Sequence, residues 1–253
     1  MPGAGRLIAA LVAALVLAAC ASAAKPKAPP PDAKFPVEAY FPLNAGRRWS
    51  YRVQDFRKGW TYRNNVKVYG VRRYGDREGI EVEERYTGGG TFWVLEEQEP
   101  VLYYRDQGFL HRLFLTRQGG KLVPASGSGD TRFLPAILEA GASWDSATVA
   151  FQVQAGETGF EVKHRHLLVV DPAVIRVPAG SFSNCIRVDT YSSHGPGSGA
   201  HGDEIAFYYS DWYAPGVGLV RTQQWDDEKR TKERSRIELL EYSADEGGST
   251  DGG

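Results

Sequence analysis

The stretch Trp49-Ser50-Tyr51-Arg52-Val53 alternates large apolar side chains with polar ones. A second stretch, Ile205-x-Phe207-x-Tyr209, carries large apolar side chains at the same spacing. Successive side chains of a β-strand point to opposite faces of its sheet, so this alternation indicates strands with one face on a core and the other in water. These stretches predict antiparallel β-structure.

Similar short runs, rich in Val, Tyr, Phe, Trp and Thr, extend over most of the chain, and Gly, Pro, Asn or Asp breaks separate them. Closely spaced strands divided by turn residues are typical of antiparallel sheets, sandwiches and barrels. We therefore expect an all-β fold, a curved antiparallel sheet in the form of a half-barrel or open barrel, with little helix. The expected strands are 49–56, 61–74, 79–87, 91–97, 101–105, 109–117, 148–154, 160–170, 184–191, 204–213, 217–225 and 236–242.

The only helix that the pattern predicts is 133–140, and Pro135 limits it to about two turns. A short motif occurs twice: an apolar run that contains a proline ends in Gly46-x-x-Trp49 and again in Gly141-x-x-Trp144. Each glycine is expected to turn the chain, and each tryptophan to enter the core. The repeat indicates a single β domain, 35–242, that is built from two similar halves, 35–118 and 132–242.

The first 34 residues are expected to direct export and anchoring. One charged residue, Arg6, precedes an apolar run at 7–19, which has the length of a signal-peptide core and falls short of the about 20 residues that span a membrane. The run ends in Leu17-Ala18-Ala19-Cys20, which resembles the signal of bacterial lipoproteins. That resemblance implies a signal peptide at 1–19, which is removed, and lipidation of Cys20 with attachment to a membrane. Ordinary secretion, with cleavage after 21–23, is the alternative.

A Pro- and Ala-rich tether, 20–34, would then hold the domain away from the membrane, and a Gly-, Ser- and acid-rich tail, 243–253, is expected to be disordered. The residue after the cysteine is Ala21 and not an aspartate, which resembles the pattern of outer-membrane lipoproteins in some Gram-negative bacteria. We therefore expect an exported protein that is lipid-anchored to the cell envelope, with the outer membrane favoured.

The charge and cysteine content exclude several classes of function. Without Arg6, the only charged side chain of 1–19, the chain keeps 29 basic and 31 acidic side chains, which gives no electrostatic case for binding nucleic acid. After lipidation of Cys20, only Cys185 remains, so no internal disulfide can form. Cys185 lies in a strand-like stretch, and we expect it to be a small buried apolar residue.

Three segments carry a resemblance to a known group: Val-Pro-Ala-Gly-Ser-Phe-x-x-Cys at 177–185, Trp-Tyr-Ala-Pro-Gly-Val-Gly-Leu-Val at 212–220, and Phe-Pro-Leu-x-x-Gly-x-x-Trp-x-Tyr at 41–51. They resemble uncharacterised secreted bacterial proteins related to LolA- and LolB-like lipoprotein carriers. The resemblance implies a curved antiparallel half-barrel and brings no catalytic residues.

Enzyme signatures are missing from the sequence: it has no Gly-x-Ser-x-Gly elbow, no Gly-x-x-x-x-Gly-Lys phosphate loop and no Gly-x-Gly-x-x-Gly that follows a strand and precedes a helix. We expect no enzymatic activity and no cofactor. The leading hypothesis is non-enzymatic binding of a lipid, acyl chain or hydrophobic peptide on the concave face of the sheet. Apolar alternation assigns to that face Phe109, Leu113, Phe160, Val162, Phe207 and Tyr209.

Two other classes stay open. A structural or adaptor lipoprotein would bind an envelope protein through edges or loops, without a small ligand. A metal-dependent enzyme would use His164 and His166, which share one face of a strand, together with His111, because neutral imidazole suits zinc and copper. The alternative for the histidine pair is a hydrogen-bonded or solvated position at the end of the core.

Overall fold

The computed structural model describes residues 34–88, 98–119, 121–124, 131–146, 149–151, 160–194 and 207–243. The leader, Cys20 and most of the tether lie outside these ranges, so their assignments stay predictions. The one helix in the described part of the chain is the single 3-10 turn η1, Val37–Ala39. Nothing among the described residues forms a helix with the length and apolar character needed to cross a bilayer.

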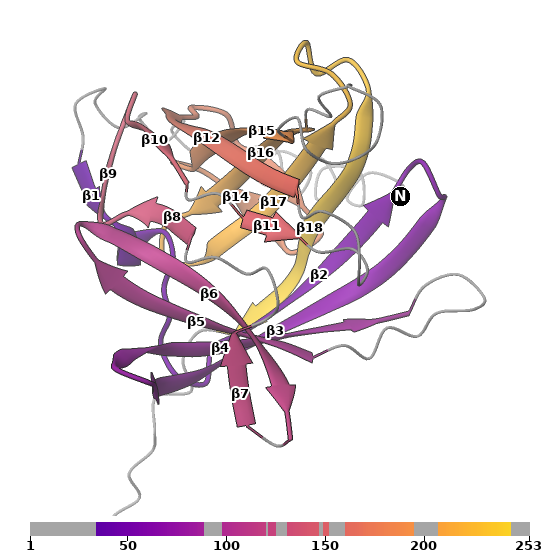
Figure 1. The fold of residues 1–253 in the computed structure, drawn as a ribbon. Coiled ribbons are helices and arrows are strands. Elements are labelled where there is room, and N and C mark those ends of the chain that lie inside the picture. The colour runs from indigo at the N-terminus through magenta and orange to yellow at the C-terminus, as the bar shows by residue number, and fades with distance from the viewer. Residues whose placement is uncertain are drawn as a thin grey trace, which may run out of the picture.

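Fourteen of the strands form one antiparallel sheet, which curves without closing into a barrel (Figure 1). This confirms the predicted fold class. The strand order is β10-β12-β15-β16-β17-β18-β2-β3-β4-β5-β6-β7, with β11 on β12 and β8 on β6. The strands are β1 (Lys34–Pro36), β2 (Arg48–Asp55), β3 (Trp60–Tyr74), β4 (Arg77–Thr87), β5 (Gln98–Asp106), β6 (Phe109–Gln118), β7 (Lys121–Pro124), β8 (Thr131–Pro135), β9 (Ile137–Glu139), β10 (Ser143–Asp145), β11 (Val149–Phe151), β12 (Phe160–Val170), β13 (Ile175–Val177), β14 (Gly180–Phe182), β15 (Ile186–His194), β16 (Phe207–Ala214), β17 (Gly218–Trp225) and β18 (Glu233–Ser243).

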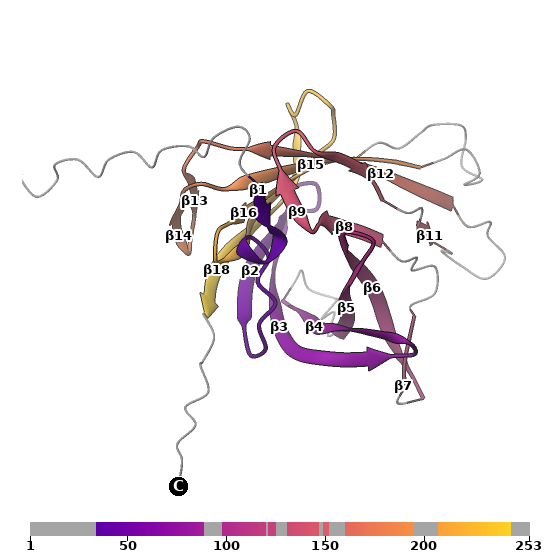
Figure 2. The same ribbon diagram turned by 90° about the vertical axis from the view of Figure 1, so that its left-hand side faces the viewer.

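The last strand joins the two halves of the sheet, because β18 pairs with β17 on one side and with β2 on the other. Away from β18, one half of the strand order leads through β6, which pairs with β7 and β8, and the other half leads to β12, which pairs with β10 and β11. Figure 2 shows the consequence: the strands from β3 to β6 curl beneath β12 and β15, so that the two ends of the strand order face each other. We call the concave side of the curved sheet the hollow, and the place where β8 and β12 face each other across it the seam.

The repeated Gly-x-x-Trp motif makes the same backbone contacts in both halves. Gly46 N–H donates to the Val68 carbonyl at 2.9 Å, and Gly141 N–H donates to the Leu168 carbonyl at 2.8 Å. Both glycines have positive φ, +86° and +80°, which explains why glycine stands there. Both tryptophans are buried, as predicted, each at 7 % exposure.

The predicted helix at 133–140 is wrong. Its residues form the end of β8, which pairs with β6, and β9, which pairs with β1. Pro135 provides no backbone N–H for a helical hydrogen bond, and extended strands bury Leu134 and Leu138 at 1 % and 0 % exposure. Tertiary pairing therefore overrides a segment with weak helical preference.

Two apolar clusters lie on opposite faces of β5 and β6. The main core spans both halves of the sheet and includes Tyr103 and Leu110. A smaller cluster on the other face is formed by Leu102, Tyr104, Leu113 and Leu115, with Leu122 of β7 packed against it. Strand β6 therefore buries apolar side chains on both faces, and Tyr74 of β3 and Leu122 of β7, the strand paired with the end of β6, pack against the outer cluster.

Candidate functional site

The segment 37–44 lies across one end of the hollow and fills part of it. Its backbone is held by hydrogen bonds from Val37 N–H to the Ala136 carbonyl at 2.9 Å and from Gly216 N–H to the Ala39 carbonyl at 2.7 Å. Phe41 enters the interior, where its ring contacts three aromatic rings from different strands, those of Tyr103 at 5.2 Å, Phe133 at 5.1 Å and Tyr213 at 6.1 Å. This aromatic cluster separates two cavities, which we name the Phe41 cavity and the Arg112 cavity.

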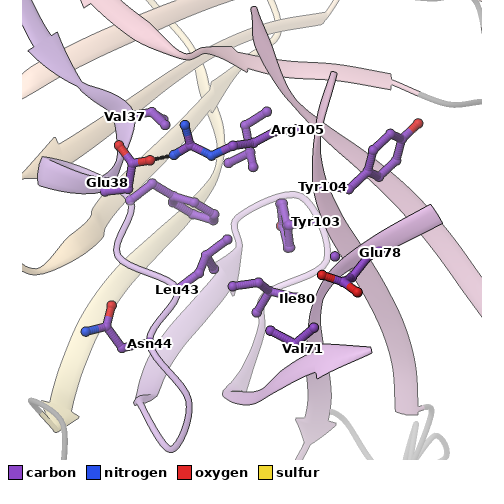
Figure 3. A pocket seen from close by; sticks show the side chains of 13 residues that line it. Val37, Glu38, Leu43, Asn44, Val71, Glu78, Ile80, Tyr103, Tyr104 and Arg105 are labelled. Carbon is purple, nitrogen blue, oxygen red and sulfur yellow. Dashed lines mark ion pairs between the residues drawn. The ribbon is translucent and has the colours of Figure 1, made fainter. Parts of the chain in front are cut away.

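The Phe41 cavity has a volume of about 370 Å³ and a mainly apolar wall (Figure 3). Its apolar side chains come from the 37–44 segment on one side and from β3, β4, β5 and β6 on the other. At its rim, Glu38 and Arg105 form an ion pair. The full lining is Val37, Glu38, Phe41, Leu43, Asn44, Val71, Glu78, Gly79, Ile80, Tyr103, Tyr104, Arg105 and Leu110.

Two glycines shape the wall of this cavity. Gly70 has φ +106° at the bulge where β3 changes register against β4, so the strand bends there. Gly79 lets β4 approach β5 closely, because a Cβ at this position would lie 2.5 Å from the Tyr103 carbonyl oxygen and 3.0 Å from Leu102 Cγ. Beyond the bulge, Val71 lines the cavity while 63 % of it stays exposed. The cavity is therefore accessible from solvent.

The Arg112 cavity, of about 280 Å³, lies at the seam and has a more polar lining. One wall comes from β6 and β8, and the other from β12, β15 and β16, which lie toward the opposite end of the strand order. Its lining is Arg112, Thr131, Arg132, Phe133, Leu134, Ser146, His164, His166, Val188, Thr190, Ser192, Tyr209, Asp211 and Tyr213.

Hydroxyl groups hold the two histidines in this cavity. His166 Nδ1 lies 2.8 Å from Thr190 Oγ1, and its Nε2 lies 2.7 Å from Ser146 Oγ. His164 Nδ1 lies 2.5 Å from Ser192 Oγ. Burial, followed by the nearby charges of His164 and Arg112, lowers the pKa of His166 to about 3, so this imidazole is neutral at physiological pH.

Arg112 is one of two arginines, with Arg132, that line this cavity. Its guanidinium lies over the rings of Phe114 and Phe133, at 4.6 Å and 5.1 Å from their centroids. It also donates a hydrogen bond to the Tyr103 hydroxyl, which lowers the pKa of that group, although burial raises it overall to about 12. The buried Arg112 Nε has no hydrogen-bond partner among the described residues.

Asp211 lies in the same cavity and accepts a hydrogen bond from the Thr222 hydroxyl at 2.6 Å. Burial raises the pKa of its carboxyl from 3.8 to about 6, against the opposing effects of that hydrogen bond and of the Arg112 charge. Arg112 therefore does not neutralise Asp211 fully. The cavity combines two guanidinium groups, two imidazoles, hydroxyl groups and a carboxyl that titrates near pH 6.

The six residues that alternation assigned to the concave face have different positions. Tyr209 lines the Arg112 cavity, whereas Phe109 packs against the edge of the main core and is absent from the described lining of both cavities. The placement of Leu113 is wrong, because it packs with Leu102 and Tyr104 on the opposite face. The remaining three, Phe160, Val162 and Phe207, lie in β12 and β16, and their side chains fall outside the described part of the structure.

The structure does not bring the side chains of His111, His164 and His166 together. His164 and His166 stack on one another inside the hollow, with ring centroids 6.1 Å apart. His111 stacks on Tyr104 at 5.2 Å, on the other face of the sheet. In the part of the chain that the structure describes, no three His, Cys, Asp or Glu residues come together as a metal site.

The prediction for Cys185 is confirmed. It is a free cysteine with 0 % exposure, and burial raises the pKa of its thiol to about 12. A thiol of this kind carries almost no thiolate at neutral pH, so it is unsuited to nucleophilic chemistry.

Sequence alternation missed Arg112, Asp211 and the 37–44 segment. In β6, apolar residues stand at both parities, so alternation could not assign its inner face, and Arg112 points inward where Leu113 was expected. The sequence did offer one usable sign for Asp211, since it shares parity with Tyr209 and Tyr213 in a strand whose inner face is otherwise aromatic.

Comparison with known proteins identifies a shared fold but no family. No family model and no curated protein matches the chain. Among solved structures, a proposed lipoprotein of Parabacteroides distasonis has a TM-score of 0.53 at 17 % identity, over 81 % of this chain and 99 % of that one. A proposed exported protein of Bacteroides fragilis with a YmcC-like fold covers the same shares at 15 % identity and a TM-score of 0.43. The first of these similarities shows a shared fold.

Proposed function

We propose that this chain is a non-enzymatic envelope lipoprotein, anchored through Cys20 to the outer membrane, that holds an acyl chain in the Phe41 cavity. The observation that carries the proposal is a solvent-accessible cavity of about 370 Å³ with a mainly apolar wall. Ligand pockets commonly have volumes of about 300–1,000 Å³ and such walls. The binding surface proposed here lies at one end of the concave face, where the 37–44 segment narrows it.

The chemistry of the wall favours an acyl chain over a peptide. Phe41, Leu43, Ile80 and Leu110 offer apolar contact, and the polar groups gather at the rim with the Glu38–Arg105 ion pair. Each buried methylene contributes about 0.8 kcal/mol, so about six of them give on the order of 5 kcal/mol before any headgroup contact. A peptide backbone would bring N–H and C=O groups that an apolar wall cannot satisfy.

Two further observations support export and anchoring. The lipoprotein-like signal ends at Cys20, and the solved relative with a shared fold is itself described as a proposed lipoprotein. The resemblance to LolA- and LolB-like carriers, in segments at 41–51, 177–185 and 212–220, also agrees with a hollow that carries an apolar ligand.

Uptake of a neutral apolar probe tests the binding role. The mature domain should bind N-phenyl-naphthylamine with one-to-one stoichiometry, followed by the rise in probe fluorescence, and dodecanol should displace it. Val71→Glu should weaken uptake at least tenfold, because it places a carboxylate in the cavity wall. Val71 is 63 % exposed, so the substitution should leave the fold intact.

Leu167→Glu is the matched control, because Leu167 is a strand residue that is 43 % exposed and absent from the described cavity linings. It should bind the probe as the unchanged protein does. If the unchanged domain takes up no probe, or if both variants lose uptake equally, the carrier proposal fails and an adaptor that binds an envelope protein becomes the better explanation.

A further inference from the structure

The Arg112 cavity differs in chemistry from the Phe41 cavity, and the proposed function does not use it. We propose that it is a second binding site, which takes a small organic anion, a carboxylate or phosphate group, on the guanidinium of Arg112. The two sites are separated by the ring cluster of Phe41, Tyr103, Phe133 and Tyr213. The inference therefore stands independently of acyl-chain binding.

The position of Arg112 is the first step of the argument. Its strand neighbours His111 and Leu113 face the other side of the sheet, so Arg112 alone of the three enters the hollow. There it rests on the faces of Phe114 and Phe133, and Tyr103 is its hydroxyl partner. Aromatic faces hold the guanidinium in place without neutralising it, and its Nε stays without a partner among the described residues.

A guanidinium that is held on a cavity wall in this way favours an anion. Removing a charge from water is costly unless a partner compensates it, and arginine presents planar, paired donors that match carboxylate and phosphate oxygens. Asp211 does not supply full compensation, since its pKa stays raised at about 6 beside Arg112. A ligand anion at Arg112 would complete the charge pairing.

The rest of the lining fits a small polar ligand. Hydroxyl groups of Thr131, Ser146 and Ser192 line the cavity, and a hydroxyl that accepts its hydrogen bond from a histidine keeps its own proton to donate to an anionic oxygen. The histidine rings are already oriented by Ser146, Thr190 and Ser192, so the wall is organised before a ligand arrives. The cavity lies between β8 and β12, which belong to opposite ends of the strand order.

Asp211 should make anion binding depend on pH. When its carboxyl is ionised it repels a second anion, and when it is protonated it can donate a hydrogen bond to one. Charged and polar groups from six strands surround Asp211. They are Arg112 on β6, Arg132 on β8, His164 and His166 on β12, Thr190 on β15, Tyr209 and Tyr213 on β16, and Thr222 on β17. Asp189, on the reverse face of β15, also acts on its charge. Of these, Asp211 changes its charge near pH 6, and His166 stays neutral.

Isothermal titration of the mature protein with benzoate and, separately, with inorganic phosphate tests the proposal in a chloride-free buffer. Arg112→Gln should weaken binding at least tenfold, and Arg112→Lys, which keeps the charge without the paired donors, should weaken it less. Arg165→Gln is the control: it removes one positive charge from the same sheet, at an exposed residue paired with Asp145 outside the cavity. It should bind as the unchanged protein does.

Benzoate stays ionised from about pH 5.5 to about pH 8, so the pH dependence of binding can be measured with it. Its affinity should rise severalfold as the pH falls through this range, and Asp211→Asn should bind it tightly and lose most of this pH dependence. Binding of either anion supports the site, and the tighter one identifies the class of ligand. If neither anion binds, if Arg165→Gln loses as much affinity as Arg112→Gln, or if Asp211→Asn keeps the pH dependence, the proposal is overturned.

Discussion

Replacing Asp211 with asparagine should stabilise the protein at alkaline pH. Burial raises the pKa of this carboxyl from 3.8 to about 6 in the folded state. A group with a raised folded pKa contributes its full stability below the unfolded pKa and loses it as the pH rises through the folded pKa. The ionised carboxyl therefore destabilises the fold above about pH 6, and asparagine removes that cost.

The magnitude follows from the pKa values. At about 1.4 kcal/mol for each unit, the difference between 3.8 and about 6 corresponds to about 3 kcal/mol near pH 8 and about half of that near pH 5. This is an upper limit, because the carboxyl lines a cavity that admits water. Asparagine keeps an Oδ1 acceptor for the Thr222 hydroxyl, so the hydrogen bond at 2.6 Å can be retained.

Urea unfolding, followed by tryptophan fluorescence near pH 8 and near pH 5, measures the effect. The variant should be more stable than the unchanged protein at both pH values, with the larger gain near pH 8. His166, whose pKa burial lowers, titrates in both proteins, so its contribution cancels in the difference. A variant that is equally or less stable near pH 8 would show that Asp211 is solvated or paired in the fold, and the argument from burial would be refuted.

Two further predictions concern the fold. Gly79→Ala should destabilise the domain by about 2 kcal/mol in urea unfolding, because the new methyl would lie 2.5 Å from the Tyr103 carbonyl oxygen. Gly108 is a turn glycine with φ +78°, and a Cβ there would have no atom within 4 Å, so Gly108→Ala should lower the stability by only about 1 kcal/mol. Cys185 should resist a thiol reagent in the native protein and react on unfolding, since it is fully buried with a raised pKa; rapid labelling of the native protein would contradict its placement.

Alternation predicted the sheet because most strands have one apolar and one polar face. The prediction for β2 succeeded, since Trp49, Tyr51 and Val53 are all buried at 7 % exposure or less. It failed for β6, where both faces are covered, and at 133–140, where partners far away in sequence determine the strands. A local pattern of side chains carries no information about which distant segments pair. The position of the 37–44 segment and the two cavities that it separates therefore could not be predicted from the sequence.

The rows of residues paired across the sheet next to the two Gly-x-x-Trp motifs differ in chemistry. Across the first half, Val68 stands opposite Val82, and Val82 opposite Val101. Across the second, the equivalent row runs from Leu168 to Val188 and ends at Asp211.

The positions beside the tryptophans diverge in the same way, since Trp49 faces Val66 and Trp144 faces His166. Matching backbone contacts at Gly46 and Gly141 set the same register in both halves, so the difference lies in side chains and not in architecture. One row stays apolar, whereas the other places a carboxyl and an imidazole at the matching positions, and both of these groups line the Arg112 cavity. A buried charge lowers the stability of the fold unless another group pairs with it or a ligand binds it. The row that ends at Asp211 is therefore where a function distinct from packing should be sought.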